Sequence, residues 1–340
     1  MRQLVTGGAG FLGYHLARRL AGEGHEVHLV DNLSRGRLDR DMQALLEHPN
    51  LSFIQADLTD PGTLTRLEGG YDGVYHLAAI IGVANVMERP QQVLAVNART
   101  LLNLLDWYAA GNARRLFFAS TSEAYAWTMT FHELPIPTPE DVPLAVDRVG
   151  NRRASYALSK VFGEMAVVHT CQSAGKPYTI ARYHNVYGPR MGMQHVIPEM
   201  YRRIYDRQAP LVVYSVDHRR AFCYVDDAVE ATLGLMAPEV PSEVYNIGND
   251  AAEVTIGNLA REMLAWAGRP DTEIAARESS APGIARRCPD IGRLRRTVGF
   301  TPRFSLHAGL EPTLSWYREF FEREGRELAG TRRAAATEGA

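Results

Sequence analysis

The sequence predicts an α/β protein with a Rossmann-like, doubly wound parallel sheet and a smaller C-terminal α/β lobe. Two observations predict this fold. Apolar, strand-like runs alternate with helical stretches over the first half of the 340 residues. A glycine-rich turn also joins the first such run to the first helical stretch, as is typical of the first turn of a doubly wound sheet.

Five runs are typical of buried parallel strands because they are apolar on both faces. They read "RQLVTG", "EVHLVD", "LSFIQAD", "GVYHLAA" and "RRLFFAS". Helical stretches lie between them, including 11–24 and 90–111. In the second stretch, residues at helical spacing would face a core: Val93, Val96, Leu101, Leu104, Leu105 and Tyr108. Ligands are then expected beyond the carboxyl ends of the strands.

Composition excludes several classes of partner. The net charge of −2 gives no electrostatic reason to expect nucleic acid or an anionic membrane. No apolar run approaches the roughly 20 residues that cross a bilayer, and strand-like "QLVTG" follows Met1-Arg2 without room for a signal peptide. Cys171, Cys223 and Cys288 show neither metal-ligand spacing nor a disulfide framework. We therefore expect a cytoplasmic protein with no metal site.

The glycine turn "TGGAGFLG" at 6–13 predicts a dinucleotide site. Gly7, Gly10 and Gly13 allow a tight turn, and they let a pyrophosphate approach the start of the helix. Asp31 ends the second strand, where a carboxylate can bind the adenine ribose and would repel a 2′-phosphate. This favours NAD, although Arg35 and Arg37 leave NADP possible.

The next strand ends offer further candidates near the coenzyme. Asp57 could meet the adenine edge or could cap the helix before Pro61. Residues 76–79 read "HLAA", and the two alanines at the end are small enough to let a flat coenzyme approach the backbone closely. Asn97 lies in an otherwise apolar helix, so its amide needs partners. It either lies near the coenzyme or ties neighbouring backbone together.

Tyr156 and Lys160 predict oxidoreductase chemistry. Their spacing in "YALSK" puts both on one face of a helix. The charge of Lys160 can lower the pKa of the phenol, as would an oxidised nicotinamide nearby. Such a tyrosinate can take a hydroxyl proton while hydride leaves the same carbon.

Over residues 1–320 the chain resembles the extended short-chain dehydrogenase/reductases of the nucleotide-sugar epimerase/dehydratase superfamily. The motifs that carry this resemblance are "TGGAGFLG", "DN" at 31–32, "DL" at 57–58, "HLAA", "STSEAY", "YALSK", "RYHNVYGPRM", "RRAFCYVDD", "YNIGN" and "RRCPDI". The resemblance implies that tightly held NAD oxidises a hexose hydroxyl, usually at C4. Epimerisation, dehydration or decarboxylation follows, and the hydride usually returns.

The resemblance also implies roles for individual residues. The coenzyme contacts would be Gly7, Gly10, Phe11, Leu12, Gly13, Asp31, Asn32, Asp57, Leu58, Leu77, Ala78, Ala79, Asn97, Tyr156 and Lys160. The catalytic residues would be Thr121, Glu123, Tyr156 and Lys160, with the Thr121 hydroxyl on the sugar O4. The nucleotide-diphosphate sugar, expected to be UDP-linked, would meet Ser122, Asn185, Arg220 and Arg287.

Glu123 favours one reaction among those of the superfamily. In simple 4-epimerases an apolar residue usually follows the hydroxyl residues, whereas Thr121-Ser122-Glu123 is more similar to UDP-glucuronate decarboxylases and to 4,6-dehydratases. "GPRM", "AFCYVDD", Arg153 and "PDI" are similar to the decarboxylases. We therefore favour a UDP-glucuronate decarboxylase. The alternatives are a UDP-sugar 4-epimerase, then a 4,6-dehydratase, and last a non-catalytic NAD sensor.

The domain organisation follows the same resemblance. We expect an NAD-binding domain at 1–175, completed by segments that return from the second half, a sugar-binding lobe mainly at 176–321 and a disordered tail at 322–340. Relatives often dimerise through helices equivalent to 88–110 and 156–174, so we expect a homodimer.

Overall fold

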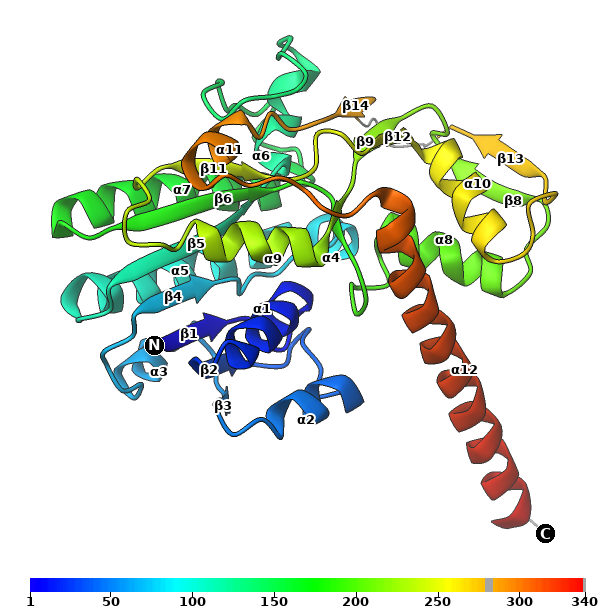
Figure 1. The fold of residues 1–340 in the computed structure, drawn as a ribbon, viewed down its shortest axis with the longest axis horizontal. Helices are drawn as coiled ribbons and strands as arrows, with labels where there is room; N and C mark the ends of the chain where they lie inside the picture. Colours follow the sequence, from blue (N-terminus) through cyan, green and yellow to red (C-terminus); the bar gives the residue numbers. More distant parts are fainter. Residues whose placement is uncertain (279–283, 339–340) are drawn as a thin grey trace.

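The computed structural model describes residues 1–278 and 284–338 (Figure 1). In these residues, seven parallel strands form one sheet in the order β11-β6-β5-β4-β1-β2-β3. They are β1 (Arg2–Thr6), β2 (Glu26–Asp31), β3 (Leu51–Gln55), β4 (Gly73–His76), β5 (Arg115–Thr121), β6 (Tyr178–Tyr183) and β11 (Val244–Ile247). The predicted α/β fold is confirmed, and β6 and β11 return from the second half of the chain.

Helices cover both faces of the sheet (Figure 1). α5 (Pro90–Ala110) and α7 (Ala154–Ala174) pack together on one face, and α1 (Phe11–Gly22) and α9 (Val225–Gly234) pack together on the other. Neighbouring side chains on a strand therefore enter different cores: Leu4 joins the core with α5, and Val5 joins the core with α1.

The second lobe holds two small sheets. β8 (Leu211–Tyr214) pairs with β13 (Ile274–Arg277), while β9 (Arg219–Ala221) lies between β12 (Glu253–Thr255) and β14 (Arg286–Arg287). The helices α8 (Val196–Tyr205), α10 (Ile256–Trp266) and α12 (Leu306–Glu338) belong to the same lobe. Leu259 and Leu314 of this lobe share one apolar core with Val5 of the main sheet. The two lobes are thus packed against each other.

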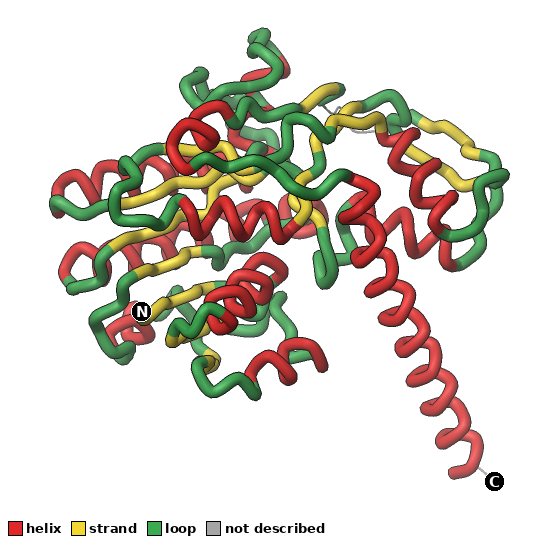
Figure 2. The backbone as a smooth tube through the Cα atoms, in the orientation of Figure 1, coloured by secondary structure: helices red, strands yellow, loops and turns green. Residues whose placement is uncertain are grey.

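Short elements complete the fold. They are α2 (Arg40–Leu46), α3 (Pro61–Thr65), α4 (Val83–Glu88), α6 (Glu123–Ala126), η1 (Thr128–Thr130), α11 (Gly292–Val298), β7 (Val186–Tyr187) and β10 (Cys223–Tyr224), the last two paired with each other. Figure 2 shows the loops that join them, including the loop that follows η1. Within the described residues, no helix combines the length and apolar character that crossing a membrane requires.

Residues 322 to 338 of the tail belong to α12, and residues 339 and 340 lie outside the described residues; disorder of this tail in solution stays a prediction. α12 continues through residue 322 to Glu338 and projects away from the rest of the molecule (Figure 1). The segment "REGRELAGTRRAAATE" explains this, since Ala, Arg and Glu lose little side-chain freedom in a helix.

Candidate active site

The glycine turn between β1 and α1 leaves no space for a side chain at Gly7 or Gly13. A Cβ on Gly7, which has a φ of +71°, would lie 2.8 Å from the backbone nitrogen of Ala78, and one on Gly13 would lie 2.3 Å from the carbonyl oxygen of Gly7. Gly10 precedes α1 without a capping side chain, so the first N–H groups of this helix can bind phosphate oxygens. The predicted residues of the turn lie together: Gly7, Gly10, Phe11, Leu12 and Gly13.

Asp31 lies at the carboxyl end of β2, beside this turn. Its carboxylate accepts hydrogen bonds from the backbone N–H groups of Ala9 (3.1 Å) and Leu33 (2.8 Å). Burial raises the pKa of Asp31, and these two hydrogen bonds oppose the rise. Asn32 donates a hydrogen bond of 3.2 Å to Asp57, which joins the ends of β2 and β3. A carboxylate that can bind a ribose is therefore held next to a turn that can bind phosphate.

Asp57 and Leu58 differ in their surroundings. Asp57 accepts hydrogen bonds from the backbone and hydroxyl of Thr59, both at 2.8 Å. Asp60, not Asp57, caps the helix that begins at Pro61, so that alternative for Asp57 is wrong. Leu58 is buried in the core beneath the sheet edge, and this position offers only its backbone to a coenzyme.

Residues 77–79 pass directly beneath the glycine turn, and Asn97 holds the chain just after them. The Leu77 N–H donates to the carbonyl of Thr6 at 3.1 Å. The amide of Asn97 accepts from the Ile80 N–H (2.7 Å) and donates to the Ile80 carbonyl (3.1 Å) and to the Ser159 hydroxyl (3.0 Å). Asn97 therefore ties the end of β4 to α7, which is the second of the two roles considered for it.

These residues fit NAD. A cradle that a Cβ would fill, a helix N-terminus without a capping side chain and a carboxylate at the end of β2 are the three features that a dinucleotide needs. Arg35, which left NADP possible, reaches toward Gly192 and Tyr156. A Cβ on Gly192 would lie 3.1 Å from Arg35 Nη2, and the charge of Arg35 acts on Tyr156.

Thr121 and Tyr156 meet at the carboxyl end of β5. The Thr121 side chain is hydrogen-bonded to the Tyr156 phenol, and it also accepts from the Glu123 N–H at 3.2 Å. Burial raises the pKa of Tyr156 to about 12; the hydrogen bond to Thr121 and the charge of Arg35 oppose this rise, and the charge of Glu123 adds to it. The phenol is therefore protonated at neutral pH in the absence of a further positive charge.

Lys160 lies one helical turn after Tyr156 and is almost completely buried. Its ammonium group donates to the Ala119 carbonyl at 2.7 Å and lies 4.8 Å from the centre of the Phe118 ring. Burial lowers the pKa of Lys160 to about 8, although the charge of Glu164 opposes this shift. Ser120 donates a hydrogen bond to the same Glu164.

Glu123, the first residue of α6, lies among positive charges. Its carboxylate forms an ion pair with Arg287. Burial would raise the pKa of Glu123, but attraction to Arg287, with further contributions from Arg153 and Arg220, brings it below its ordinary value. The three arginines carry +3 and Glu123 carries −1, so these four residues sum to +2. They therefore attract an anion.

Arg220 and Arg287 lie directly opposite each other on β9 and β14. Their neighbours Arg219 and Arg286 face the other side, where both pair with Glu253. Burial and the charge of Arg287 lower the pKa of Arg220 to about 10. Like charges directly opposite on neighbouring strands destabilise a sheet, and a bound anion would remove that cost.

Asn185 and Ser122 lie at the same edge of the main sheet. Asn185, with a φ of 40°, donates from its amide to the Ala221 carbonyl at 3.0 Å. The Ser122 N–H donates to the Tyr183 carbonyl at 3.0 Å, and its side chain lines a small cavity with Arg287. Ser122 thus lies beside Arg287, while Asn185 connects β6 to β9.

The sequence named Arg153 only as a similarity to the decarboxylases and Arg35 only as a possible NADP contact, and it gave His184 no role. Arg153 acts on Glu123, and the signal for it was its place three residues before Tyr156. Arg35 and His184 give no such signal, because both reach the site through contacts between distant segments.

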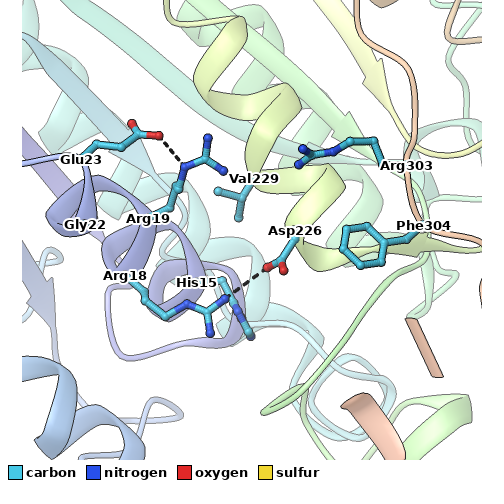
Figure 3. A pocket seen from close by; sticks show the side chains of 9 residues that line it. All are labelled: His15, Arg18, Arg19, Gly22, Glu23, Asp226, Val229, Arg303 and Phe304. Atoms are coloured by element: carbon cyan, nitrogen blue, oxygen red, sulfur yellow. Dashed lines mark hydrogen bonds and ion pairs between the residues drawn. The ribbon is translucent and has the colours of Figure 1, made fainter. Parts of the chain in front are cut away.

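A larger hollow lies between α1 and α9, and none of the predicted site residues lines it (Figure 3). Its volume is about 540 Å³. Arg18 pairs with Asp226 at 3.3 Å and Arg19 pairs with Glu23, as the dashed lines show. Since these arginines are neutralised, the hollow lacks the excess charge found around Glu123.

Comparison with known proteins gives a family match. Residues 3–248 match the model of the NAD dependent epimerase/dehydratase family. A UDP-N-acetyl-alpha-D-glucosaminuronate decarboxylase from Bacillus cytotoxicus is 33% identical over 327 residues, which cover 94% of this chain and 98% of the relative. UDP-glucuronic acid decarboxylase 1 from Xenopus tropicalis is 32% identical over 327 residues, covering 95% of this chain and 73% of the relative.

The fold is also similar to solved structures. A UDP-glucose 4-epimerase from Thermotoga maritima, solved with UDP-glucose, superposes with a TM-score of 0.82 at 28% identity. The match covers 94% of this chain and all of the other.

Proposed function

The chain belongs to the NAD dependent epimerase/dehydratase family, and from this premise we propose that it is a decarboxylase of a UDP-linked hexuronate. It is an enzyme of nucleotide-sugar chemistry, and NAD is its coenzyme. The observation that carries the proposal is the ion pair of Glu123 with Arg287, next to Tyr156. A carboxylate and an arginine at this place can act on C5 and C6 of the sugar. A reaction that only inverts C4 has little need of them.

The first step is oxidation of the sugar at C4. Tyr156 takes the proton of the C4 hydroxyl, and Thr121 donates a hydrogen bond to O4. NAD, when bound, would supply the hydride acceptor for C4, and its oxidised nicotinamide would place positive charge near the Tyr156 phenol before the transfer. Lys160 keeps an ammonium group one helical turn away and stabilises the tyrosinate by charge.

The second step is loss of carbon dioxide. The C4 ketone is β to the C5 carboxylate, so the electron pair of the C5–C6 bond can move into the ketone as carbon dioxide leaves. C5 then takes up a proton from solvent, and Tyr156 returns its proton to O4 when the hydride removed in the first step returns to C4. Ionised Glu123 repels the C5 carboxylate of the substrate. This repulsion favours loss of the carboxylate as neutral carbon dioxide.

The positive cluster supports an anionic substrate. Arg287 and Arg220 can bind diphosphate oxygens with their planar guanidinium groups, and Arg153 can meet the hexuronate carboxylate. The decarboxylases from Bacillus cytotoxicus and Xenopus tropicalis support a UDP-linked glucuronate or its 2-acetamido form as the substrate. The overall charge of +2 around Glu123 matches such an anion.

A second candidate is a UDP-sugar 4-epimerase. The similarity to the Thermotoga maritima epimerase favours it, since the same Tyr156 chemistry at C4 would serve inversion. A 4,6-dehydratase ranks below it because Ser122 stands where one branch of dehydratases has an acid. A non-catalytic NAD sensor ranks last because Thr121, Tyr156 and Lys160 are all present.

Product mass decides between these reactions. The purified chain would be incubated separately with UDP-glucuronate, its 2-acetamido form, UDP-glucose, GDP-mannose and dTDP-glucose. We expect loss of carbon dioxide from one of the two uronates and no reaction with the neutral sugars. Loss of water would indicate a dehydratase, and a new isomer of unchanged mass would indicate an epimerase; either result refutes the proposal.

The assembly and the compartment belong to the same proposal. We infer a homodimer that forms through α5 and α7, which present the partly exposed apolar side chains Leu94, Leu102, Phe162 and Met165. Three buried free cysteines support a reducing, cytoplasmic compartment.

A further inference from the structure

A small cavity lies beside Arg287, and Glu123 is not among its lining residues. Its lining includes Ser122, His184, Arg287 and Cys288. The cavity has a volume of about 10 Å³, which is room for about one water molecule. No residue of this cavity other than Ser122 and Arg287 has a place in the proposed reaction.

His184 lines this cavity and has one buried ring nitrogen without a hydrogen-bond partner among the described residues. Its Nε2 lies 3.0 Å from Asn246 Oδ1, and that amide is oriented by donating to the carbonyls of Thr138 and Asp290, both at 3.0 Å. Asn246 Oδ1 is therefore an acceptor, so Nε2 of His184 carries the proton and Nδ1 has a free lone pair. Burial lowers the pKa of His184 to about 4, which keeps the ring neutral at neutral pH.

Arg287 lines the same cavity and has a buried donor to set against that acceptor. One of its terminal nitrogens, Nη1, pairs with Glu123. Its Nε–H and the Nδ1 atom of His184 are both buried, and neither has a partner among the described residues. An unpaired donor on a guanidinium group and an unpaired acceptor in one cavity both carry a desolvation cost.

We propose that one water molecule binds in this cavity, accepts from Arg287 Nε and donates to His184 Nδ1, and that His184 is thereby a positioning residue for Arg287. Water fits because the site offers one donor and one acceptor; an anion would satisfy only the donor, and a cation would satisfy only the acceptor. The functional part rests on the proposed function, in which Arg287 binds the substrate anion.

The water would hold Arg287 in a defined plane. A guanidinium group binds phosphate or carboxylate with two parallel hydrogen bonds only when its plane is correctly oriented. Fixing Nε orients that plane while leaving the terminal nitrogens free to exchange Glu123 for the substrate. His184 is in turn held by Asn246, which also accepts a 2.8 Å hydrogen bond from Tyr125.

The water itself is tested by a crystal structure of the full chain with NAD, at a resolution that shows ordered water. We expect density within hydrogen-bond distance of both Arg287 Nε and His184 Nδ1. A cavity without density, or a protein group in that position, would overturn the inference. This test does not depend on which sugar the enzyme converts.

Two substitutions separate positioning from a structural role. In His184→Asn the side-chain amide oxygen can take the place of Nδ1, whereas in His184→Gln the amide group takes the place of Nε2 and the acceptor at Nδ1 is lost. We expect calorimetry to show UDP binding about tenfold weaker for His184→Gln and nearly unchanged for His184→Asn. Equal binding by both variants, or the reverse order, would refute the role of His184.

A control distinguishes this outcome from failure of the proposed function. If the wild-type chain bound UDP but released no carbon dioxide from either uronate, the proposed function would fail, and the density and the two affinities would still decide the role of His184. Thermal unfolding of both variants checks that each has folded.

Discussion

At the scale of single residues, opposite charges and burial set the protonation states of the site. Burial raises the pKa of Tyr156 and lowers that of Lys160, so each environment favours the neutral form. Glu123 behaves differently, because Arg287 and its neighbours outweigh burial and keep it ionised. The site therefore holds an ionised carboxylate beside a protonated phenol.

The phenol oxygen of Tyr156 is expected to be essential for turnover. Tyr156→Phe removes the group that takes the C4 proton, and we expect kcat to fall by about 10³-fold. The affinity for UDP should remain within about twofold, because the arginines are unchanged. Calorimetry and product formation measure the two effects, with Tyr214→Phe at an exposed position as the control. Unchanged turnover in Tyr156→Phe would contradict the mechanism.

The lowered pKa of Lys160 predicts how kcat/KM and the free energy of unfolding depend on pH. Its pKa is lowered from 10.5 to about 8, so the ammonium charge is present below about pH 8 and absent above it. We expect kcat/KM to fall as pH rises through about 8. Between about pH 8 and pH 10.5 the folded chain has lost this proton, whereas the unfolded chain still binds it. In this range Lys160 therefore makes the free energy of unfolding increase as pH rises. A pH profile that stays flat up to pH 10 would contradict this assignment.

At the scale of elements, α7 and the turn before α1 place the chemistry. Tyr156, Lys160 and Glu164 follow one another at four-residue spacing on α7, so one face of this helix meets the end of β5. The turn before α1 has a different constraint, since backbone segments lie too close together for a Cβ on Gly7 or Gly13.

Gly13→Ala should disrupt the coenzyme site. The added methyl would lie 2.3 Å from the Gly7 carbonyl oxygen, so backbone must move. We expect a loss of about 1–3 kcal/mol in the free energy of unfolding and at least about tenfold weaker NAD binding, since a displaced turn no longer fits the phosphates. Urea unfolding measures the change in the free energy of unfolding, and calorimetry measures the change in NAD binding.

The same helix supplies the control. Gly22 also lies in α1, and a Cβ there meets nothing within 4 Å. Gly22→Ala should leave NAD binding unchanged and stabilise the protein by up to about 1 kcal/mol. If the two variants bound NAD equally well, close packing of the turn would not matter for the coenzyme.

At the scale of the whole molecule, exposed apolar side chains on α5 and α7 remain after both cores have formed. Leu102 and Phe162 are 42% and 44% exposed. Burying such side chains against a second copy would favour association.

The double variant Leu102→Glu, Phe162→Glu should be monomeric. Both side chains lie on the surface, so charge there opposes association without opening a core. Light scattering after gel filtration would show a monomer for this variant and a dimer for the wild type and for Tyr214→Glu, which changes an exposed residue outside these helices. A dimer in all three would place the interface elsewhere.

The sequence by itself determined the fold class, the glycine turn and the spacing of Tyr156 and Lys160. These features depend on residues within a few positions of one another, through steric limits at glycine and the periods of strand and helix. The five predicted strands, β1 to β5, and the helices α1 and α5 therefore lie where the sequence pattern predicts them.

Only the tertiary structure decided which distant residues meet. Glu123 and Arg287 are separated by 164 positions, and they pair because β14 runs beside β9 at the carboxyl edge of the main sheet. In the same way, packing decided that Leu58 enters the core, that Asn97 binds backbone and that His184 lies beside Arg287. Such contacts leave no periodic pattern in the sequence around either residue. They arise when burial of apolar surface brings separate segments together, and the polar groups then find the partners that lie within reach.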